Sequence, residues 1–169
     1  MSFYELAAAR YSVRKFSSNP IEPEKLKKVL EAGRVAPTAK NSQSHRIIIA
    51  DTAEDIAKVD GCTPCRYGAP TVIFVCYDNT ECWVREFDNE PSGVVDASIV
   101  TTHLMLAAQD VGLGTCWVMR FDPAKAVELF ALPENIIPVA FLPIGYPAED
   151  AAPSDRHEDR MTIEELMKI

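Results

Sequence analysis

The sequence predicts an α+β sandwich, in which helices pack on a central sheet. Helical and strand-like patterns alternate irregularly along the 169 residues, and about four strands are expected. Two helices precede the first strand. The long helical stretch from about Val94 to Val111 is apolar on more than one face, so it belongs in a core or, in so small a protein, a subunit interface. A single domain, residues 1–169, is expected at this length.

The two helices before the first strand have clear boundaries. The first runs from about Phe3 to Ala9 and ends in the polar segment 10–16. Pro23 opens the second, because proline fits the first turn of a helix. Its apolar positions 26, 29, 30 and 33 recur at helical spacing, and Pro37 is expected to stop it.

The later elements follow from residue type. Thr71 to Tyr77 is a β-branched and aromatic run and the strongest strand in the sequence. Asp122 and Pro123 supply the start of a helix that reaches about Phe130, while Thr162 and Glu165 form a capping-box pattern for a short C-terminal helix. The other expectations are strands at 47–49, 115–118 and 137–144, a helix at 53–59 and a loop-like segment at 145–160.

Charge and composition exclude several classes of function. The formal charge of −8 disfavours a nucleic-acid binder or a protein that binds an anionic membrane surface. The longest apolar stretch, residues 94–113, contains Asp96, His103 and Asp110, so it is not expected to span a membrane. The first residues lack the pattern of a signal peptide, and five cysteines do not form a dense disulfide framework. We therefore expect a cytoplasmic protein.

Arg10, Ser12 and Arg14 form the first candidate site. In an extended segment these alternate residues point the same way. Two guanidinium groups and a hydroxyl on one side suit a phosphate, because guanidinium binds oxyanions bidentately. The alternative is a solvated basic turn, which is the better interpretation of this motif in isolation.

The loop from Ala36 to Gln43 is the second candidate. It combines small residues, which let the backbone approach a ligand, with amide side chains that both donate and accept hydrogen bonds. Such a loop suits the edge of a heterocycle. In isolation, an ordinary helix-to-strand connection is again the better interpretation.

Taken together, the motifs of this chain resemble the short-chain nitroreductase family, in order and spacing, over nearly the whole length. The motifs are Arg-x-Ser-x-Arg at 10–14, Ala-Pro-Thr-x-x-Asn-x-Gln at 36–43, Asp96-Ala97, Gly-Leu-Gly-Thr-Cys-Trp at 112–117, Phe121-Asp122, Leu-Pro-Glu at 132–134 and Leu-Pro-Ile-Gly-Tyr-Pro-Ala-Glu at 142–149. None of them is specific alone.

The resemblance implies an FMN site. The matching residues for the phosphate, and for the flavin edge near N1 and O2, are Arg10, Tyr11, Ser12 and Arg14, together with the C-terminal Arg156 and Arg160. The loop that would reach the partner subunit's flavin matches Pro37, Thr38, Ala39, Asn41 and Gln43, and the strand end beside the ring matches Cys116, Trp117, Val118 and Met119. A cation near N1 and O2 would favour the reduced flavin.

The resemblance also implies a fold and a reaction. The fold would be a nitroreductase-like sandwich with a mostly antiparallel sheet, whose long central helix lies at a homodimer interface. NAD(P)H would pass a hydride to flavin N5 and on to a small acceptor, such as a nitroaromatic or a quinone, with ping-pong kinetics. No protein acid, base or metal is required, and His45, His103 and His157 are expected to be structural or solvent-facing. The alternative is a flavin carrier or redox sensor with little turnover.

Three positions depart from the family pattern. Ser44 and His45 replace the usual Pro-Trp after the glutamine, and Met119 and Arg120 replace a glycine turn, which could narrow the acceptor site or make it cationic. Cys62 and Cys65 lie where relatives often supply an amide to the flavin. Their CxxC spacing allows a redox dithiol or part of a zinc site, but two incidental thiols are the better interpretation.

Overall fold

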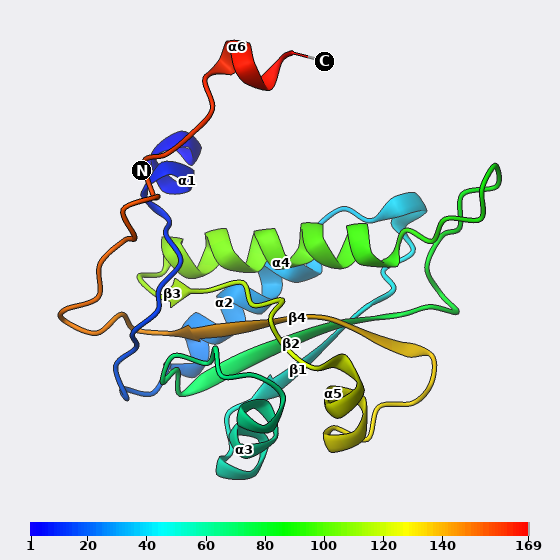
Figure 1. Ribbon diagram of the computed structural model, residues 1–169, viewed down its shortest axis with the longest axis horizontal. Helices are drawn as coiled ribbons and strands as arrows, with labels where there is room; N and C mark the ends of the chain where they lie inside the picture. The colour runs from blue at the N-terminus through cyan, green and yellow to red at the C-terminus, as the bar shows by residue number, and fades with distance from the viewer. Residues whose placement is uncertain (169) are drawn as a thin grey trace.

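The computed structural model describes residues 1–168 and shows three layers. A four-stranded sheet forms the middle layer. Helices α2 (Pro23–Arg34) and α4 (Gly93–Asp110) cover one face, and α3 (Ala53–Cys62) and α5 (Pro123–Leu129) lie on the other (Figure 1). This arrangement confirms the predicted α+β sandwich.

The sheet is antiparallel throughout, in the order β1-β2-β4-β3. Its strands are β1 (His45–Ala50), β2 (Thr71–Asp78), β3 (Gly114–Thr115) and β4 (Ile136–Gly145). Strand β2 lies between β1 and β4, and every one of its residues is buried. Helices cover both of its faces, which explains why its sequence is a continuous apolar run without polar alternation.

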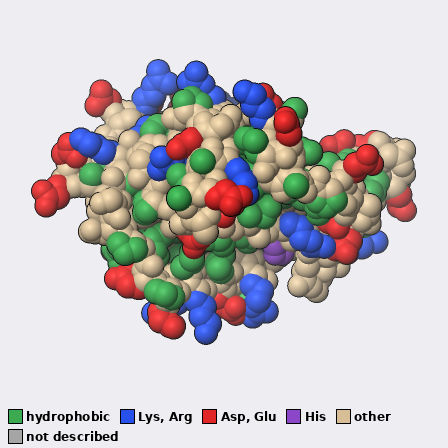
Figure 2. Space-filling model, turned by 90° about the horizontal axis from the view of Figure 1, so that it is seen from below, with side chains coloured by type: hydrophobic (Ala, Val, Ile, Leu, Met, Phe, Trp, Pro, Cys, Tyr) green, Lys and Arg blue, Asp and Glu red, His purple; other side chains and the backbone are tan. Residues whose placement is uncertain are grey.

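Because alternate side chains of a strand point to opposite faces, β2 contributes to two separate cores. Ile73 and Val75 pack toward α2 and α4, in a core that also includes Leu104. Val72 and Phe74 pack on the other side, where the Phe74 ring lies 4.4 Å from that of Phe141. The face covered by α3 and α5 carries a mixture of acidic, basic and apolar side chains (Figure 2).

Helix α4 is apolar on two sides, as predicted. Ala97, Val100, Leu104 and Ala108 follow helical spacing and are fully buried. On another side, an apolar groove of about 450 Å³ opens between α4, α2 and the N-terminal helix α1 (Phe3–Ala9). We call this the α1/α4 groove; it is lined by Phe3, Leu6, Ala32, Thr102, His103, Leu106, Ala107 and Asp110.

Helix α2 ends at Arg34, before Pro37, which agrees with the prediction that this proline stops the helix. One predicted strand differs from the structure. The strand expected at 115–118 is shorter. Cys116 donates its N–H to the carbonyl of Pro143, but proline has no N–H to return, so pairing is interrupted until Val118 forms an isolated bridge with Phe141.

The ends of α4 lead to different parts of the molecule. Helix α1 and the C-terminal helix α6 (Ile163–Leu166) lie near the C-terminal end of α4, and segment 79–92 projects from the other end (Figure 1). Thr162 and Glu165 form the predicted capping box of α6. Within residues 1–168, no helix has both the length and the apolar character to cross a membrane.

Candidate functional site

Strand β3 fixes the position of the basic segment 10–14. Val13 donates its N–H to the carbonyl of Thr115 at 2.9 Å, and Ser12 forms a parallel bridge with Thr115. Gly114 permits this close approach, because a Cβ there would lie 2.4 Å from Val13 Cγ2. The backbone pairing buries Val13, while Ser12 and Arg14 remain accessible on the opposite side.

A cavity of about 130 Å³ lies beside this segment. We call it the basic cavity; it is lined by Arg10, Tyr11, Ser12, Arg14, Ser154, Arg156, His157 and Arg160. Four guanidinium groups and three hydroxyl-bearing side chains therefore line the cavity from the two ends of the chain. This donor set suits the oxygens of a phosphate group, because guanidinium groups form short charge-assisted hydrogen bonds with oxyanions.

Ser154 and His157 were missed at the sequence level. His157 was expected to be structural or solvent-facing, yet its ring contributes to the wall of the basic cavity and packs edge-on against Tyr11, with the ring centres 6.3 Å apart. Its place beside Arg156 was the available signal. Proximity of a histidine and a serine to two arginines does not by itself show which way their side chains face.

The cysteines of the predicted site are buried thiols, and Cys116 lies near Ser12 and Arg14. Burial raises the pKa of the Cys116 thiol, and the neighbouring Arg14 and Ser12 only partly oppose this effect. Burial also raises the pKa of Cys62. Since the thiolate is the reactive form, this shift disfavours a redox dithiol at Cys62 and Cys65. Residues 1–168 contain no group of three potential metal ligands.

The loop at 37–43 has a strained backbone. Lys40, Asn41 and Gln43 all have positive φ, at 48°, 55° and 50°. Such conformations in non-glycine residues cost about 1–3 kcal/mol each and persist only where the surroundings enforce them. Here Thr38 Oγ1 accepts the N–H of Gln43 at 3.0 Å. Strain of this kind concentrates at ligand-binding sites, which agrees with a functional role for the loop.

Asp96 anchors this loop to the first turn of α4. Its carboxylate is 1% exposed and accepts hydrogen bonds from Ala39 N–H at 2.8 Å, Ser92 Oγ at 2.7 Å and Ser42 Oγ at 3.5 Å. A carboxylate in the first turn also interacts favourably with the helix dipole. Asp96 was noted in the sequence as part of the family pattern, but its contact with the loop is visible only in the structure.

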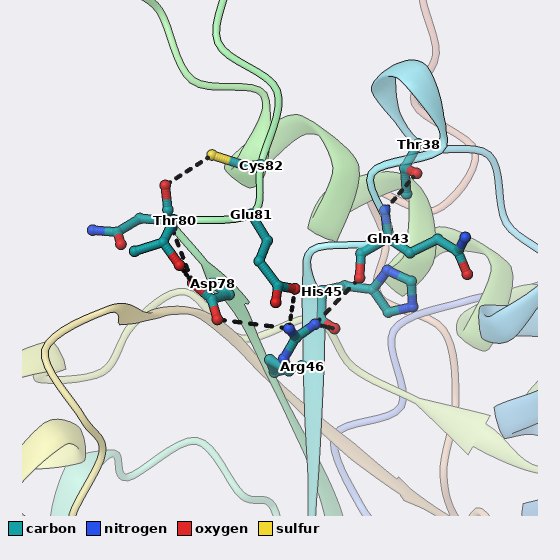
Figure 3. A network of polar contacts seen from close by, with 9 residues as sticks. Thr38, Gln43, His45, Arg46, Asp78, Thr80, Glu81 and Cys82 are labelled. Atoms are coloured by element: carbon teal, nitrogen blue, oxygen red, sulfur yellow. Dashed lines mark hydrogen bonds and ion pairs between the residues drawn. The ribbon is translucent and has the colours of Figure 1, made fainter.

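A second polar network fixes the exit of the loop into β1 (Figure 3). Arg46 donates to the carbonyls of Gln43 at 3.2 Å and His45 at 3.0 Å, and its guanidinium also pairs with Asp78 and Glu81. The His45 ring lies on the same side as the Gln43 side chain. Burial lowers the pKa of His45, and its buried Nδ1 has no hydrogen-bond partner among residues 1–168.

The loop and the basic cavity lie at opposite ends of α4. Asp96 holds the loop at the first turn of the helix, whereas Thr115, which pairs with Ser12, follows its last turn. Eighteen helical residues span about 27 Å. The structure therefore brings Arg10, Tyr11, Ser12, Arg14, Arg156 and Arg160 together, but it leaves Pro37, Thr38, Ala39, Asn41 and Gln43 in a separate group.

The third predicted group, Cys116 to Met119, continues from the basic cavity. Thr115 borders the segment that carries Ser12, and the chain then runs past Cys116 to the turn at Met119 and Arg120. Val118 donates its N–H to Phe141, whereas, within residues 1–168, the N–H groups of Trp117 and Met119 have no backbone acceptor. Met119 is 68% exposed, so its side chain lies at the surface.

Comparisons with known proteins agree with this architecture. The chain is 31% identical to a Methanothermobacter thermautotrophicus protein that carries the name NADH dehydrogenase/NAD(P)H nitroreductase, over 97% of this chain and 87% of that one. It is 29% identical to the Bacillus subtilis FMN reductase [NAD(P)H], over 86% of this chain, and spans only 66% of that protein.

A solved structure shares more of the sequence and has nearly the same fold. A nitroreductase family protein from Clostridium difficile 630 is 39% identical, with a TM-score of 0.94 over 99% of this chain and 98% of that one. The sequence also matches the Nitroreductase family at residues 7–62 and 57–146. With the sheet, the central helix and the motif order in agreement, this chain belongs to the nitroreductase family.

Proposed function

We propose that this protein is an FMN-dependent oxidoreductase that takes electrons from NAD(P)H and passes them to a small acceptor. The basic cavity is the observation that carries this proposal, because four arginines converge there in a chain of formal charge −8. The relatives' names, an FMN reductase [NAD(P)H] and an NAD(P)H nitroreductase, support the same cofactor and donor.

The residues of the basic cavity fit the phosphate of FMN. Arg10, Arg156 and Arg160 supply cationic donors, and Ser12 supplies a hydroxyl from the segment that β3 holds in place. When bound, FMN would supply a two-electron carrier between donor and acceptor. We therefore infer one FMN-binding domain that covers the whole chain, with the phosphate at the basic cavity and the ring toward Met119.

This chain's own residues would bind and polarise the cofactor without an acid or base of their own. The N–H of Met119, which has no backbone acceptor within residues 1–168, can donate a hydrogen bond to a ring nitrogen, and Arg14 can stabilise negative charge on the polar edge of the ring. Val118 and Cys116 fix the segment between these groups through their bonds to β4. Catalysis would then depend on position and electrostatics.

We further propose a homodimer. The α1/α4 groove is apolar, and exposed Val94 and Val95 add to the apolar character of the same helix. Apolar surface of this kind marks an interaction site. A two-fold pair would also let the loop at 37–43 of one subunit reach the cofactor of its partner, which a single chain does not achieve. We propose the cytoplasm as its location, since all five cysteines are unpaired thiols.

The visible spectrum of the purified protein and steady-state kinetics test this function together. We expect flavin absorption bands, and NAD(P)H oxidation that depends on an added quinone or nitroaromatic, with parallel double-reciprocal lines because one site serves donor and acceptor in turn. Flavin bands without turnover would instead support a flavin carrier or redox sensor. A colourless protein that does not bind added FMN would refute the proposal.

A further inference from the structure

The turn at Met119 and Arg120 carries an unpaired cation at the ring end of the proposed FMN site. Both side chains are exposed, and within residues 1–168 the Arg120 guanidinium forms no ion pair or hydrogen bond. Neither residue has positive φ, so the turn accepts side chains where the family pattern has glycine. The sequence departure is therefore built into an unstrained backbone.

The backbone of this turn is fixed from a second element. Thr63, which is 3% exposed and lies between Cys62 and Cys65, donates its hydroxyl to the carbonyl of Arg120 at 2.6 Å. The Thr63 hydroxyl oxygen also accepts the N–H of Cys65 at 3.1 Å. Two backbone bonds flank this contact. The N–H of Phe121 donates to the carbonyl of Met119 at 3.1 Å, and the N–H of Asp122 donates to the carbonyl of Cys62 at 3.0 Å.

These contacts give the segment at 62–65 a structural role that does not depend on the thiol of Cys62 or Cys65. The Thr63 hydroxyl fixes the backbone carbonyl of Arg120, so the point from which this side chain projects is defined. Ordering of the backbone therefore adds little to the cost of binding a ligand at Arg120.

We infer that Arg120 makes this protein selective for acceptors that carry a carboxylate or a similar anionic group. The inference rests on the proposed function. The arginines of the basic cavity would be engaged by the cofactor, whereas Arg120 lies at the far end of the same segment and, within residues 1–168, has no anionic partner. Guanidinium binds carboxylate bidentately, and this geometry would orient an aromatic acceptor as well as attract it.

The charge of the whole protein makes this local cation more important. At a formal charge of −8, the average field repels anions, so an anionic acceptor gains little from long-range attraction. A fixed positive group at the mouth of the site would offset that repulsion at short range. The electron donor NAD(P)H also carries phosphates, which are a second kind of anion that Arg120 can bind. The experiment must therefore distinguish binding of the acceptor from binding of NAD(P)H.

The test compares 4-nitrobenzoate with the neutral 4-nitrobenzamide in the holoenzyme. Because both acceptors are measured on one preparation, the ratio of their kcat/KM values cancels differences in flavin content. We expect Arg120→Gln to reduce the preference for the carboxylate roughly three- to ten-fold, since a single exposed or partly exposed ion pair is lost. Arg120→Glu should reverse the preference, and added salt should weaken it in the wild type.

Thr63→Val is a second test variant, and Arg34→Gln is the matched control. Thr63→Val keeps the side-chain shape but removes the bond to Arg120, so the preference should fall by less than in Arg120→Gln. Arg34 is exposed and pairs with Glu31 on α2, so its replacement should leave the ratio unchanged. Benzoate titration, followed through the flavin absorbance, measures binding without turnover and should weaken in Arg120→Gln.

An unchanged ratio of kcat/KM values in both Arg120 variants would overturn the inference. If the KM for NAD(P)H also rose in these variants, Arg120 would be assigned to binding of the electron donor. Failure of the proposed function would look different. In that case the wild type would reduce neither nitro compound, and no flavin bands would be present.

Discussion

The two ends of α4 carry candidate sites that differ in how they are built. Near its C-terminal end, the basic cavity is enclosed by segments from both ends of the chain and gathers cations around a space. At its N-terminal end, the loop at 37–43 stores backbone strain around the buried carboxylate of Asp96, while Pro37, Asn41 and Gln43 remain exposed. The first encloses a space within one chain; the second presents its exposed residues outward.

This difference supports the proposed homodimer. A strained loop is costly unless its conformation serves a contact. Within one subunit, about 27 Å of helix separates it from the basic cavity. A two-fold partner that buries the α1/α4 groove would supply the missing contact, so assembly and cofactor binding should be linked.

Breaking the pair should have the largest effect. Leu106→Glu places a charge in the α1/α4 groove, where an unpaired buried charge is strongly unfavourable. We expect a monomer in light scattering and near-complete loss of bound flavin. Leu129→Glu on α5, at a residue already 39% exposed on the other side of the sheet, should remain dimeric and yellow. A flavin-loaded monomer of Leu106→Glu would contradict the linkage.

Removing a cation from the basic cavity should weaken FMN binding without breaking the pair. Arg10→Ala and Arg160→Ala each remove charge-assisted hydrogen bonds to the phosphate, so we expect a loss of about ten-fold or more in FMN affinity in each variant. Fluorescence titration of the apoprotein measures it. Riboflavin lacks the phosphate, so it should bind weakly to the wild type, and both variants should bind it with that same weak affinity. Equal affinity of the wild type for FMN and riboflavin would refute the assignment.

The two sites also differ in how far their sequences predict them. The Arg-x-Ser-x-Arg motif predicts an oxyanion site because alternation and chemistry are local properties of the chain, and the cavity indeed contains all three side chains. The contribution of His157 depends on where the C-terminal segment crosses α1, which no local pattern encodes. Likewise, periodicity predicts the sheet and α4, whereas β3 is shortened by Pro143 on a strand distant in sequence.

At the loop, the sequence predicts the residue types but not their support. Small residues and amides at 36–43 indicate a ligand-facing loop. The bond between Asp96 and Ala39 joins residues 57 positions apart, so it depends on the tertiary fold. Asp96 interrupts an apolar stretch, and a buried charge in such a stretch is a signal that a partner must exist elsewhere.

Weakening that support should have a smaller effect than losing a phosphate contact. Asp96→Asn replaces one acceptor oxygen with a donor that faces two hydroxyl groups, so we expect a loss of about 1–3 kcal/mol in the free energy of unfolding. The loop should shift while the basic cavity stays intact, so kcat/KM should fall several-fold more than FMN affinity does. Asp51→Asn, at an exposed residue, is the matched control. Equal losses in both quantities would show that the two sites are not separable.

The smallest expected effect concerns His45, which lies where the loop enters β1. Burial, together with Arg46, lowers the pKa of His45 in the folded protein, and Asp96 opposes this only in part. The unfolded chain keeps the usual pKa near 6.5. Between these two values the unfolded chain binds more protons, so the stability contributed by neutral His45 is present above about pH 6.5 and is lost as the pH falls through the folded pKa.

His45→Gln removes this titration. Between pH 7.5 and pH 5, the Tm of the variant should therefore fall less than the Tm of the wild type, by no more than a few degrees. Differential scanning fluorimetry on flavin-saturated protein measures both profiles. Parallel profiles would mean that His45 accepts a proton in the folded protein as readily as in the unfolded chain, and the loop would then be more open to water at this point than the buried Nδ1 indicates.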